Sequence, residues 1–433
     1  MMIMMKKINE IFSFEKGSLQ STKSIPGNYN FITASEEWKT HTSFTHECEA
    51  LVFASSASGS LGRTHYINGK FIASDLCYIL TPKKKEKVDL VFYWFVFSFL
   101  KEDIVKKTST GTSKLAINSK NFGNYELPYF DYKYQEKNKE KLLTIDKLKN
   151  KLNYNLEKEI NFLKQLRQAI LQEAVEGKPT ADWRKKHPEL ISGENSTENL
   201  LKKIKKEKEQ LIKEKKIKKE KPLSPISEEE KPFKIPDTWV YSRLGDLGFI
   251  NPRNYINNNL IISFVPMKSI SEKYGVSPDY EEKIWNEVKS GYTHFANKDI
   301  AIAKITPCFE NSKCCIFRNL RNGYGAGTTE LHVLRPIRNI VNSEYVYLFL
   351  KTPRFLKKGE SLMKGTAGQK RVPLNYFSES LIPLPPIPEQ QVIVNRISNF
   401  MNIVDELEKQ INTREEQTAQ LVHSVLRETF EQK

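Results

Sequence analysis

The two halves of this chain carry the same short patterns in the same order, and this repetition constrains the fold more than any other feature. Five patterns recur at an offset of 254 or 255 residues. They are Ser74–Leu76 and Thr329–Leu331, Asp89–Phe92 and Glu344–Tyr347, Gly111–Thr112 and Gly365–Thr366, Leu127–Pro128 and Ile382–Pro383, and Leu171–Lys178 and Leu426–Lys433. Solenoid repeats are only ~20–50 residues long, so this spacing predicts a tandem duplication of a domain-sized segment.

Each half opens with an aromatic-rich region in which short apolar runs alternate with glycine-containing turns. Runs such as residues 50–54 and 299–303 predict β-strands. A proline-bounded exit follows at Leu127–Pro128 in the first half and at residues 382–386 in the second. The predicted fold class is therefore α+β, with two α/β domains that are each followed by a long helix.

Both long helical segments carry apolar residues at alternating steps of three and four, the spacing of a coiled-coil seam. In the first helix these residues are Leu152, Leu156, Ile160, Leu163, Leu166 and Ile170. In the second they are Ile393, Ile397, Phe400, Val404, Leu407 and Ile411, and after a break at Arg414 and Thr418 the phase resumes at Leu421 and Val425. Two seams of similar length favour pairing of the helices with each other. The alternative is that each amphipathic helix lies on its own domain.

The chain is strongly basic, with 68 Lys and Arg against 52 Asp and Glu and a formal net charge of +16. Such a charge favours a polyanionic partner, most commonly nucleic acid, although it also suits a basic protein that merely stays in solution. Lys202–Lys221 concentrates 11 lysines and 4 glutamates. Its sparse apolar neighbours Leu200, Ile204 and Leu211 predict a solvated helix with little to bury, with contact to DNA phosphates as the alternative. The prolines between 222 and 236 predict a linker into the second half.

Cysteine usage and hydropathy indicate a cytoplasmic protein without a disulfide framework, a zinc site or a membrane span. The five cysteines form no Cys-x-x-Cys pair and have no histidine pair nearby. They are Cys48, Cys77, Cys308, Cys314 and Cys315. The apolar start of the chain is too short for a signal peptide, and the run Leu90–Leu100 is shorter than the ~20 residues needed to cross a bilayer.

The motifs of enzymes that act on DNA are missing from the sequence. It has no GxxxxGK[ST] loop for ATP, and residues 384–387 lack the polar and aromatic residues of a methyltransferase motif. Residues 278–283 resemble the PD…ExK pattern of nucleases, but one intervening residue cannot place the carboxylates on separate strands around a metal. Nothing pairs Cys308 with His332 as a thiol nucleophile. The chain alone is therefore predicted not to be an enzyme.

The pattern Pro-Leu-Pro-Pro-Ile-Pro-Glu-Gln at 383–390 leads into the second heptad helix. It resembles the exit of a target recognition domain in type I restriction–modification specificity subunits. The other similar segments are residues 27–35, 57–62, 166–178, 235–239, 243–246, 299–313 and 327–330. The resemblance extends over almost the whole chain. The first half departs from it, because Leu127–Pro128 runs into Tyr129–Asp131 without the Pro-Pro-x-x-Glu-Gln exit.

The resemblance implies a sequence-specific DNA-recognition subunit in which two target recognition domains each read one half of a split, asymmetric target. The two helices would form an antiparallel coiled coil with pseudo-twofold symmetry, and this coiled coil would set the spacing between the half-sites. A ~30-residue helix is ~45 Å long, against ~34 Å for one turn of DNA. The expected segments are the first recognition domain at 1–135, a central helical region with the basic helix at 136–221, the linker and second recognition domain at 222–386, and the C-terminal helix at 387–433.

The implied partners are double-stranded DNA, two methyltransferase (modification) subunits docked on the helices, and motor–nuclease (restriction) subunits reached through the complex. The methyltransferase subunits would bring S-adenosylmethionine and the motor–nuclease subunits ATP and Mg²⁺, with no cofactor or metal bound by this chain. Two alternatives stay open: a specificity subunit of another DNA methylation or phage-defence system, and a non-catalytic coiled-coil scaffold. Salt dependence separates the scaffold from a DNA-binding protein, because only DNA binding releases counterions.

Side chains on loops that reach the major groove read bases, and Lys, Arg, Ser and Thr side chains bind phosphates. In the first domain the candidate DNA-binding residues are Ser55, Ser56, Ser58, Arg63, His65, Thr110, Thr112, Ser113 and Lys114. In the second they are Lys304, Thr306, Asn311, Lys313, Thr328, Thr329, Lys364, Thr366, Gln369, Lys370 and Arg371, of which the last five lie in a glycine-bounded basic loop. The alternative for each is a solvated loop residue or a turn-capping hydroxyl. Trp183, Trp239 and the aromatic run 92–97 are expected in the core rather than on DNA.

Overall fold

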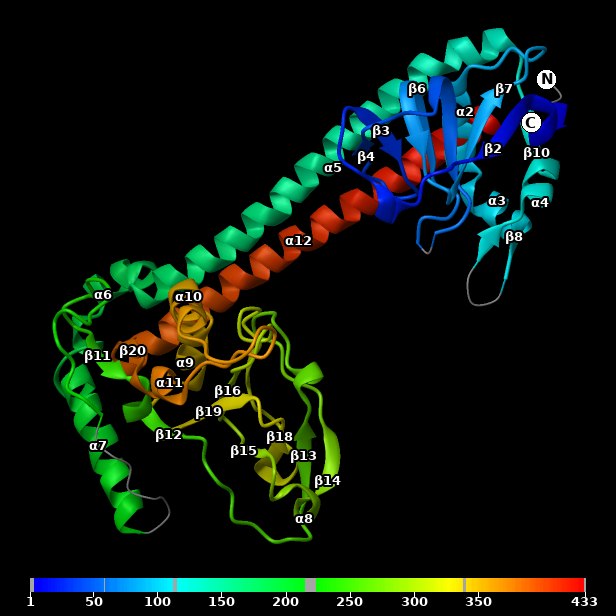
Figure 1. Ribbon diagram of the computed structural model, residues 1–433. Helices are drawn as coiled ribbons and strands as arrows, with labels where there is room; N and C mark the ends of the chain where they lie inside the picture. The colour runs from blue at the N-terminus through cyan, green and yellow to red at the C-terminus, as the bar shows by residue number, and fades with distance from the viewer. Residues whose placement is uncertain (1–3, 58, 112–114, 215–222, 338–339, 432–433) are drawn as a thin grey trace. The chain divides into compact units, whose positions relative to one another are not determined.

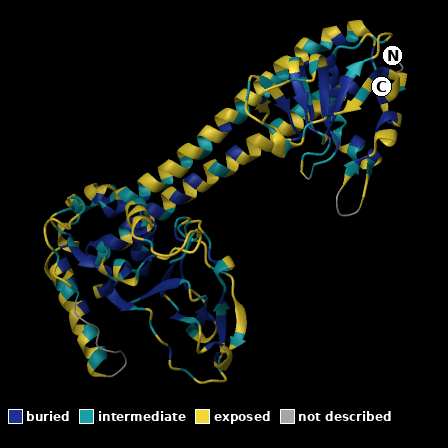
Figure 2. Cartoon of the chain, in the orientation of Figure 1, coloured by how far each residue is buried: buried dark blue, intermediate teal, exposed yellow. Residues whose placement is uncertain are grey.

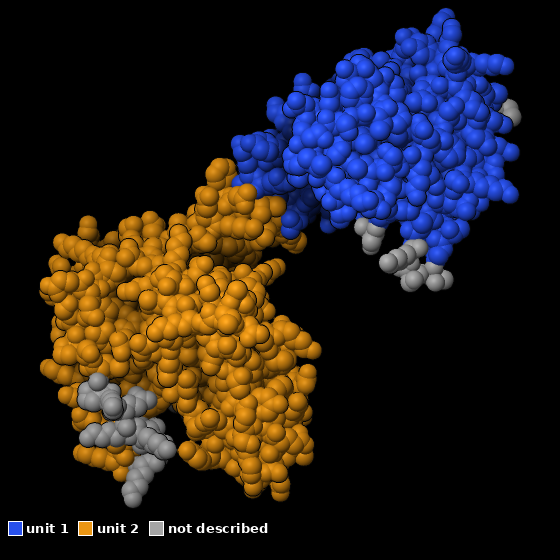
Figure 3. All heavy atoms as spheres, viewed as in Figure 1, with its two compact units in different colours: residues 1–159, 410–433 blue, residues 160–409 orange. Residues whose placement is uncertain are grey.

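The computed structural model describes residues 4–57, 59–111, 115–214, 223–337 and 340–431 (Figure 1). The chain separates into two compact units, which are coloured differently in Figure 3. Unit 1 contains residues 1–159 and 410–433, and unit 2 contains residues 160–409. Helices α5 (Tyr132–Val175) and α12 (Ile387–Phe430) each contribute residues to both units. The units therefore cut across the four segments expected from the sequence.

Unit 1 is built on a six-stranded sheet in the order β2-β7-β5-β6-β3-β4. Neighbouring strands are antiparallel except for the parallel pair β3 and β6. The central strands are buried (Figure 2), because runs such as Leu51–Phe53 carry apolar side chains on both faces of the sheet. The strand bounds are β2 Phe12–Lys16, β3 Tyr29–Ile32, β4 Lys39–His41, β5 His46–Ala54, β6 Thr64–Ala73 and β7 Cys77–Pro82.

The aromatic run expected in the core forms helix α2 (Leu90–Phe99), and this prediction is confirmed. Phe92, Tyr93 and Phe97 are buried in one cluster with Phe53 of β5 and Phe122 of α4. Asp89 caps the helix by accepting a hydrogen bond from the N–H of Phe92 at 2.9 Å, the usual role of an N-cap carboxylate. The remaining elements of this unit are β1 Met4–Lys7, α1 Ile8–Ile11, α3 Lys101–Thr108, β8 Ser109–Thr110, β9 Ala116–Ile117, α4 Ser119–Asn124 and β10 Glu126–Tyr129.

Unit 2 divides its strands between two four-stranded sheets, in the orders β12-β19-β16-β17 and β14-β13-β18-β15, beside the pair β11–β20. The strand bounds are β11 Val240–Arg243, β12 Gly248–Ile250, β13 Ile261–Val265, β14 Glu281–Ile284, β15 Thr293–Ala296, β16 Ile300–Ala303, β17 Cys314–Ile316, β18 Tyr324–Gly327, β19 Leu331–Pro336 and β20 Leu381–Leu384. The helices are α6 Ala181–Lys186, α7 Thr197–Lys213, α8 Trp285–Val288, α9 Ser343–Leu350, α10 Pro353–Ser361 and α11 Leu374–Glu379. Trp239 is buried in the core of this unit, as expected from the sequence.

The two units share a framework around the start of each long helix. Helices α5 and α12 are both 44 residues long, and the second begins 255 residues after the first. Just before each helix lies an antiparallel strand pair in which a proline faces the partner strand, Pro128 opposite Met5 and Pro383 opposite Tyr241. The carbonyl of each proline accepts a hydrogen bond from a buried tyrosine hydroxyl, Tyr93 or Tyr345.

A buried glutamine repeats in the first turn of each long helix. The amide of Gln135 donates to Phe130 O at 2.8 Å, and its oxygen accepts from the N–H of Asp89 at 2.7 Å. Gln390 donates to Pro385 O at 2.9 Å and accepts from the N–H of Asn342 at 3.2 Å. The second glutamine follows the first by 255 residues, and Asp89 and Asn342 are the N-caps of α2 and α9. The first half therefore keeps the glutamine of the expected exit motif, although it lacks the prolines.

The two long helices run antiparallel in both units, because Glu159 pairs with Arg414 in unit 1 and Arg167 pairs with Asp405 and Glu408 in unit 2. The line of partly or fully buried positions differs by one residue from part of the expected seam. In α12 it contains Ile397, Met401, Val404, Glu408, Ile411, Thr418, Val422 and Val425. In α5 it contains Leu156, Ile160, Leu163, Arg167, Ile170 and Ala174.

Four residues assigned to the seam from the sequence lie outside it. Their exposed fractions are 45% for Phe400, 40% for Leu407, 66% for Leu421 and 43% for Leu166. The seam instead takes the ion pair of Arg167 and Glu408, and Thr418 continues it rather than breaking it. A search for apolar residues at heptad spacing selects Leu166 and Leu407 instead of the neighbouring Arg167 and Glu408, and this explains the wrong assignment.

Helix α7 buries more than its lysine-rich sequence predicts. Leu200 and Ile204 are 4% and 2% exposed and lie in the core of unit 2, and Leu211 packs against the same core. The expectation of a helix with little to bury is wrong for this part of the stretch. The rest of it, residues 215–221, lies outside the described residues.

The hydropathy of the helices and the state of the cysteines can be compared with the sequence analysis. Within the described residues, no helix is long and apolar enough to cross a membrane. All five cysteines are free thiols. Burial raises the pKa of Cys77 and Cys314 to about 12, so these two thiols are protonated and unreactive at neutral pH.

Candidate nucleic-acid interface

In unit 2 the glycine-bounded basic loop expected from the sequence is an exposed hairpin. Its base is the pair Lys364 and Arg371, whose main-chain N–H and C=O groups exchange hydrogen bonds of 3.0 and 2.8 Å. Gly365 and Gly368 adopt φ angles of 133° and 77°, which a residue with a Cβ adopts only under strain. Residues 364–371 are all exposed. We call this segment the second hairpin.

The second hairpin is bound to the segment that follows strand β16. The N–H of Thr306 donates to Lys370 O at 3.0 Å, and the N–H of Val372 donates to Lys304 O at 2.8 Å. The structure thus brings together two groups of predicted DNA-binding residues that are about sixty residues apart in the sequence. Lys304 and Thr306 are half-buried at the base of the hairpin, whereas Thr366, Gln369 and Lys370 are exposed at its tip.

Two side chains before and in β19 hold the same hairpin. Glu330 accepts two hydrogen bonds from Arg371, from Nε and Nη2 at 2.9 Å each. The Arg371 guanidinium lowers the pKa of the Glu330 carboxyl, so this group is ionised at neutral pH. His332 shares a hydrogen bond of 2.9 Å between Nε2 and Val372 O, and burial lowers its pKa to about 4. Because a carbonyl oxygen only accepts, Nε2 carries the hydrogen and donates to Val372 O.

The loop 305–313, which carries two more candidates, is anchored from beneath by Lys351. This buried lysine donates from Nζ to Ser312 O at 2.8 Å and to Glu272 O at 2.7 Å, and burial lowers its pKa. The loop leaves Asn311 exposed and Lys313 half-buried. Both candidates therefore remain accessible at a loop whose main chain is fixed.

Thr328 and Thr329 lie next to Glu330 but differ in their surroundings. The hydroxyl of Thr328 accepts a hydrogen bond from the N–H of Glu330 at 3.2 Å, which is the turn-capping role named as the alternative for such hydroxyls. Thr329 is exposed. Of the two, Thr329 is the one whose side chain can reach a ligand.

Unit 1 carries a matching hairpin formed by β8 and β9, in which Thr110 faces Ala116 and Ser109 faces Ile117. Thr110 is exposed at its base, and Gly111 has a φ angle of 103°. We call the described residues 109–111 and 115–117 the first hairpin. The candidates Thr112, Ser113, Lys114 and Ser58 lie outside the described residues.

The other described candidates of unit 1, among them His65 in strand β6, serve partly structural roles. Ser55 is 2% exposed, and its hydroxyl donates to Leu76 O at 3.0 Å, so its side chain does not reach a surface. Ser56 is half-buried. Arg63 donates to Ala34 O at 3.2 Å and to the Ser60 hydroxyl at 3.1 Å. His65 Nδ1 accepts from Trp38 Nε1 at 3.2 Å, and burial lowers the pKa of His65.

The two hairpins are held by the same main-chain hydrogen bonds. In unit 1 the N–H of Ile117 donates to Ser55 O at 2.8 Å, and the N–H of Ser55 donates to Leu76 O at 2.8 Å. In unit 2 the N–H of Val372 donates to Lys304 O at 2.8 Å, and the N–H of Lys304 donates to Glu330 O at 2.9 Å. By these main-chain hydrogen bonds Ser55 corresponds to Lys304 and Leu76 to Glu330, one residue away from the sequence repeat, which aligns Leu76 with Leu331. The frame is shared, but the side chains that it presents are different.

The surface of unit 2 around its hairpin is suited to a polyanion. Within the described part of the chain, no carboxylate lies within 4.0 Å of the ammonium groups of Lys304, Lys313, Lys364 or Lys370. Lysines whose ammonium groups are not paired with a carboxylate bind phosphates as point charges. The only ion pair on this surface joins Glu330 and Arg371 among the described residues. Glu330 and Trp38 were not predicted as site residues, and only the Thr-Thr-Glu motif could have drawn attention to Glu330.

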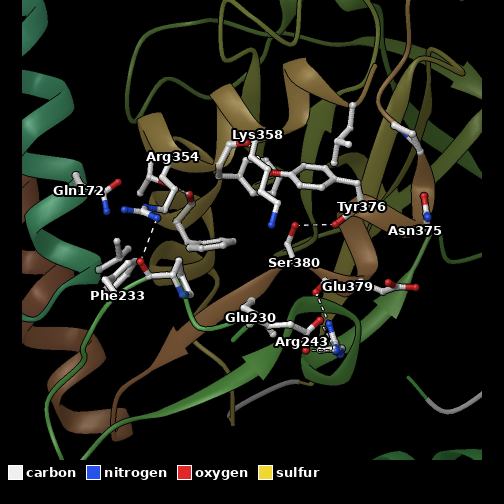
Figure 4. A pocket seen from close by; sticks show the side chains of 18 of the residues that line it. Gln172, Glu230, Phe233, Arg243, Arg354, Lys358, Asn375, Tyr376, Glu379 and Ser380 are labelled. Atoms are coloured by element: carbon white, nitrogen blue, oxygen red, sulfur yellow. Dashed lines mark hydrogen bonds and ion pairs between the residues drawn. The ribbon is translucent and has the colours of Figure 1, made fainter. Parts of the chain in front are cut away.

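A cavity of about 430 Å³ in unit 2 lies between the end of α5, the linker and helices α10 and α11, and Lys364 at the base of the second hairpin also lines it (Figure 4). Buried Arg243 ties the linker to this site through Ser224 O at 2.6 Å, Glu379 O at 3.0 Å and the Glu230 carboxylate. Arg354 donates to Pro232 O at 3.2 Å. These charged groups of the cavity are engaged in fastening the linker, so they do not identify a ligand.

The known proteins to which this chain is similar belong to one family. The sequence matches the family described as Type I restriction modification DNA specificity domain over residues 3–161 and 236–417. It is 50% identical over 265 residues to the Type I restriction enzyme EcoAI specificity subunit of Escherichia coli and 48% identical over 265 residues to the EcoEI specificity subunit of the same species. Each match covers 61% of this chain, but 44% of the EcoAI subunit and 43% of the EcoEI subunit. The chain therefore matches less than half the length of these relatives.

A solved structure supports the fold. It is described as the structural basis of complex assembly and conformational transition of the type I R-M system. The alignment has a TM-score of 0.59 and covers 99% of this chain and 97% of the chain in that structure. The sequence identity is 13%. A likeness at this identity concerns the fold alone.

Proposed function

Because the chain belongs to the type I restriction–modification DNA specificity family, we propose that it is the DNA-recognition subunit of such a system. Each unit would read one half of a split DNA target with its hairpin and the loops around it. One observation carries this proposal: two hairpins on the same main-chain frame present different side chains. A common frame gives both units one mode of approach to DNA, and different side chains give an asymmetric target.

We also infer that the chain arose by tandem duplication and that its long helices form a pseudo-twofold antiparallel coiled coil. The equal lengths of α5 and α12, the proline-facing strand pairs and the repeated glutamines support this inference. The packing of the helix ends supports it as well. Leu171 and Val175, at the end of α5, lie in the core of unit 2, and Leu426 and Phe430, which follow them by 255 residues, lie in the core of unit 1.

The proposal includes two modification subunits, and the exposed apolar residues of the helices support that number. Leu166 and Ile403 are 43% and 57% exposed in unit 2, and Leu421 and Leu148 are 66% and 60% exposed in unit 1. Leu421 follows Leu166 by 255 residues, and Ile403 follows Leu148 by 255. In an antiparallel pair, residues one position before the seam lie on the same side of both helices. Each unit thus carries one copy of the same apolar face, which would suit two copies of one partner.

The remaining parts of the system would come from other chains. We assign S-adenosylmethionine and methyl transfer to the modification subunits, and ATP, Mg²⁺ and cleavage to the restriction subunits, with this chain acting in the cytoplasm and binding no cofactor. The described residues contain no group of three His, Cys, Asp or Glu side chains able to hold a metal ion.

The test combines the chain with a type I modification subunit and S-adenosylmethionine. We expect methylation of a plasmid library at one split, asymmetric sequence, and no methylation by the chain alone. We also expect the dissociation constant for DNA to rise about 10³-fold or more between 50 and 200 mM salt if six or more phosphates are bound. Methylation by the isolated chain, or binding that ignores salt, would contradict the proposal.

A further inference from the structure

Glu330 is an unexpected residue at its position. It lies immediately before β19, on the surface that also carries Lys304, Lys364, Lys370 and Arg371. A carboxylate on a phosphate-binding surface repels the backbone of DNA, so its presence needs a reason. Its ion pair with Arg371 fastens the second hairpin, but main-chain hydrogen bonds already fasten that hairpin at Lys364, Thr306 and Val372. Tethering alone therefore does not account for Glu330.

The geometry of the pair leaves Glu330 able to bind a further donor. Arg371 occupies one position on each carboxylate oxygen, at 2.9 Å, whereas each oxygen can accept two hydrogen bonds. The side chain of Glu330 is 24% exposed and that of Arg371 is 44% exposed. The fork of Arg371, itself held by Gln369 O at 3.1 Å, fixes the carboxylate plane at the foot of the exposed hairpin. A fixed, partly exposed acceptor is what recognition of a base edge requires.

On the shared main-chain frame the position of Glu330 is taken in unit 1 by an apolar residue, and the neighbouring residue is Asp75, which the sequence repeat aligns with Glu330. Leu76 takes the place of Glu330 on the shared main-chain frame, and its side chain is 36% exposed. In the major groove, cytosine and adenine present an amino group that can donate a hydrogen bond to a carboxylate. Thymine instead presents a methyl group that an apolar side chain can contact. One position on the frame thus offers two different means of distinguishing bases.

We propose that Glu330 is a specificity-determining residue of unit 2, which reads the exocyclic amino group of cytosine or adenine in the major groove, with Arg371 as its positioning residue. Leu76 is the equivalent determinant in unit 1 and fits a thymine methyl group. This inference rests on the proposed function, because it names the base-reading position of the proposed DNA surface. It also names one position, Glu330 in unit 2 and Leu76 in unit 1, at which the two units would read different bases.

The test is a set of substitutions assayed in the full chain assembled with its modification subunits. Glu330→Gln keeps the shape but replaces one oxygen with a donor, and Glu330→Leu copies the residue of unit 1. Methylation of a randomised plasmid library, read by sequencing of modified bases, gives the preference at each target position. We expect each variant to change the preference at one base pair of one half-site by about tenfold or more, and to leave the other half-site unchanged. Leu76→Glu should alter only the other half-site.

Glu344→Gln is the matched control, because Glu344 forms a similar half-exposed ion pair with Arg318, at 2.9 Å, away from the hairpin. It should leave both half-sites unchanged. Arg371→Lys keeps the charge but loses the fork, so it should weaken the preference at the same base pair as Glu330→Gln. Melting temperatures close to wild type establish that each variant is folded.

The outcomes separate this inference from the proposed function. If folded Glu330 variants keep the wild-type sequence preference, or lose methylation equally at every sequence, Glu330 only tethers the hairpin and the inference is wrong. If the wild-type complex itself methylates no split target, the proposed function fails before Glu330 is tested.

Discussion

At the level of single residues, Glu389 shows how a buried charge can hold several segments together. It is 0% exposed, and its carboxylate accepts hydrogen bonds from Thr180 Oγ1 at 2.6 Å, from Trp239 Nε1 at 2.8 Å and from the Arg184 guanidinium. These partners come from the turn after α5, from the start of β11 and from α6, all within unit 2. A buried carboxylate is tolerated when donors satisfy both of its oxygens.

Replacing Glu389 by Ala should destabilise unit 2 strongly, because it leaves the Arg184 guanidinium partly buried without its counter-charge. Loss of one partner from a buried ion pair typically costs about 3–5 kcal/mol. Urea unfolding followed by tryptophan fluorescence measures the effect on unit 2. Glu431→Ala, which removes an exposed pair with Arg427, should cost less than about 0.5 kcal/mol. Equal effects of the two substitutions would show that the Glu389 network adds no stability.

Some of these residue roles could be read from the sequence and others could not. Glu389 and Gln390 belong to the exit motif that the sequence displays, and Trp239 was correctly expected in the core. Gln135 was missed because its half lacks the prolines, although its offset of 255 residues from Gln390 was a usable signal. Ser55 was chosen for its hydroxyl, but that hydroxyl donates a hydrogen bond to Leu76 O. A single sequence does not reveal which polar group is taken up by a neighbouring main chain.

At the level of elements, both long helices and the domain exits could be predicted, but the face of each helix could not. Apolar periodicity locates a helix well. It favoured Phe400, Leu407 and Leu421 over the seam residues Met401 and Glu408, because polar seam positions satisfied by an ion pair look like breaks. The same error concealed two of the exposed apolar residues, Leu166 and Leu421, since they had been assigned to the seam. Strand pairing in the two units depends on long-range contacts and was not predictable in detail.

The exposed apolar faces of α5 and α12 lead to a prediction about partner number. Leu166→Glu with Ile403→Glu should remove one modification subunit, and Leu421→Glu with Leu148→Glu should remove the other. Placing charges where a partner buries two aliphatic side chains should weaken that contact by at least about a hundredfold, given roughly 1.5–3 kcal/mol for each side chain. Mass photometry of the assembled complex counts the subunits.

The control for this experiment is Asn161→Glu, which adds the same charge at an exposed position of α5 on the opposite flank of the seam. It should leave two modification subunits bound. Full assembly of all four charged substitutions together would mean that the partner docks elsewhere.

At the level of the whole molecule, the internal repetition indicated elements that recur in both units, such as the buried glutamines at the start of α5 and α12. The boundaries of the compact units were not visible in the sequence. Those boundaries fall inside α5 and α12, because each helix contributes one end to each core. The linker after residue 222 was expected to be a simple spacer. Residues 224–230 are instead held by the buried guanidinium of Arg243, which donates hydrogen bonds to two main-chain carbonyls and to the Glu230 carboxylate. The composition of the linker does not reveal these contacts.

The last prediction concerns the spacing of the two half-sites. If α5 and α12 together set that spacing, four extra residues in each helix lengthen the pair by ~6 Å, close to a whole turn, so that the seam stays nearly in phase. The insertions belong between Ile160 and Leu166 in α5 and after Gln410 in α12, because these points lie between the Glu159–Arg414 pair and the ion pairs of Arg167.

The methylated sequence should then keep both half-sites and gain one or two base pairs between them, since base pairs are ~3.4 Å apart. Four residues added to α5 alone break the register with α12 and should abolish activity. Two residues added to each helix turn the seam by ~200° and should do the same. Sequencing of methylated bases measures the spacer directly. An active variant with the paired four-residue insertions and an unchanged spacer would show that these helices do not set the distance, because the longer helices would then have had no effect on the target.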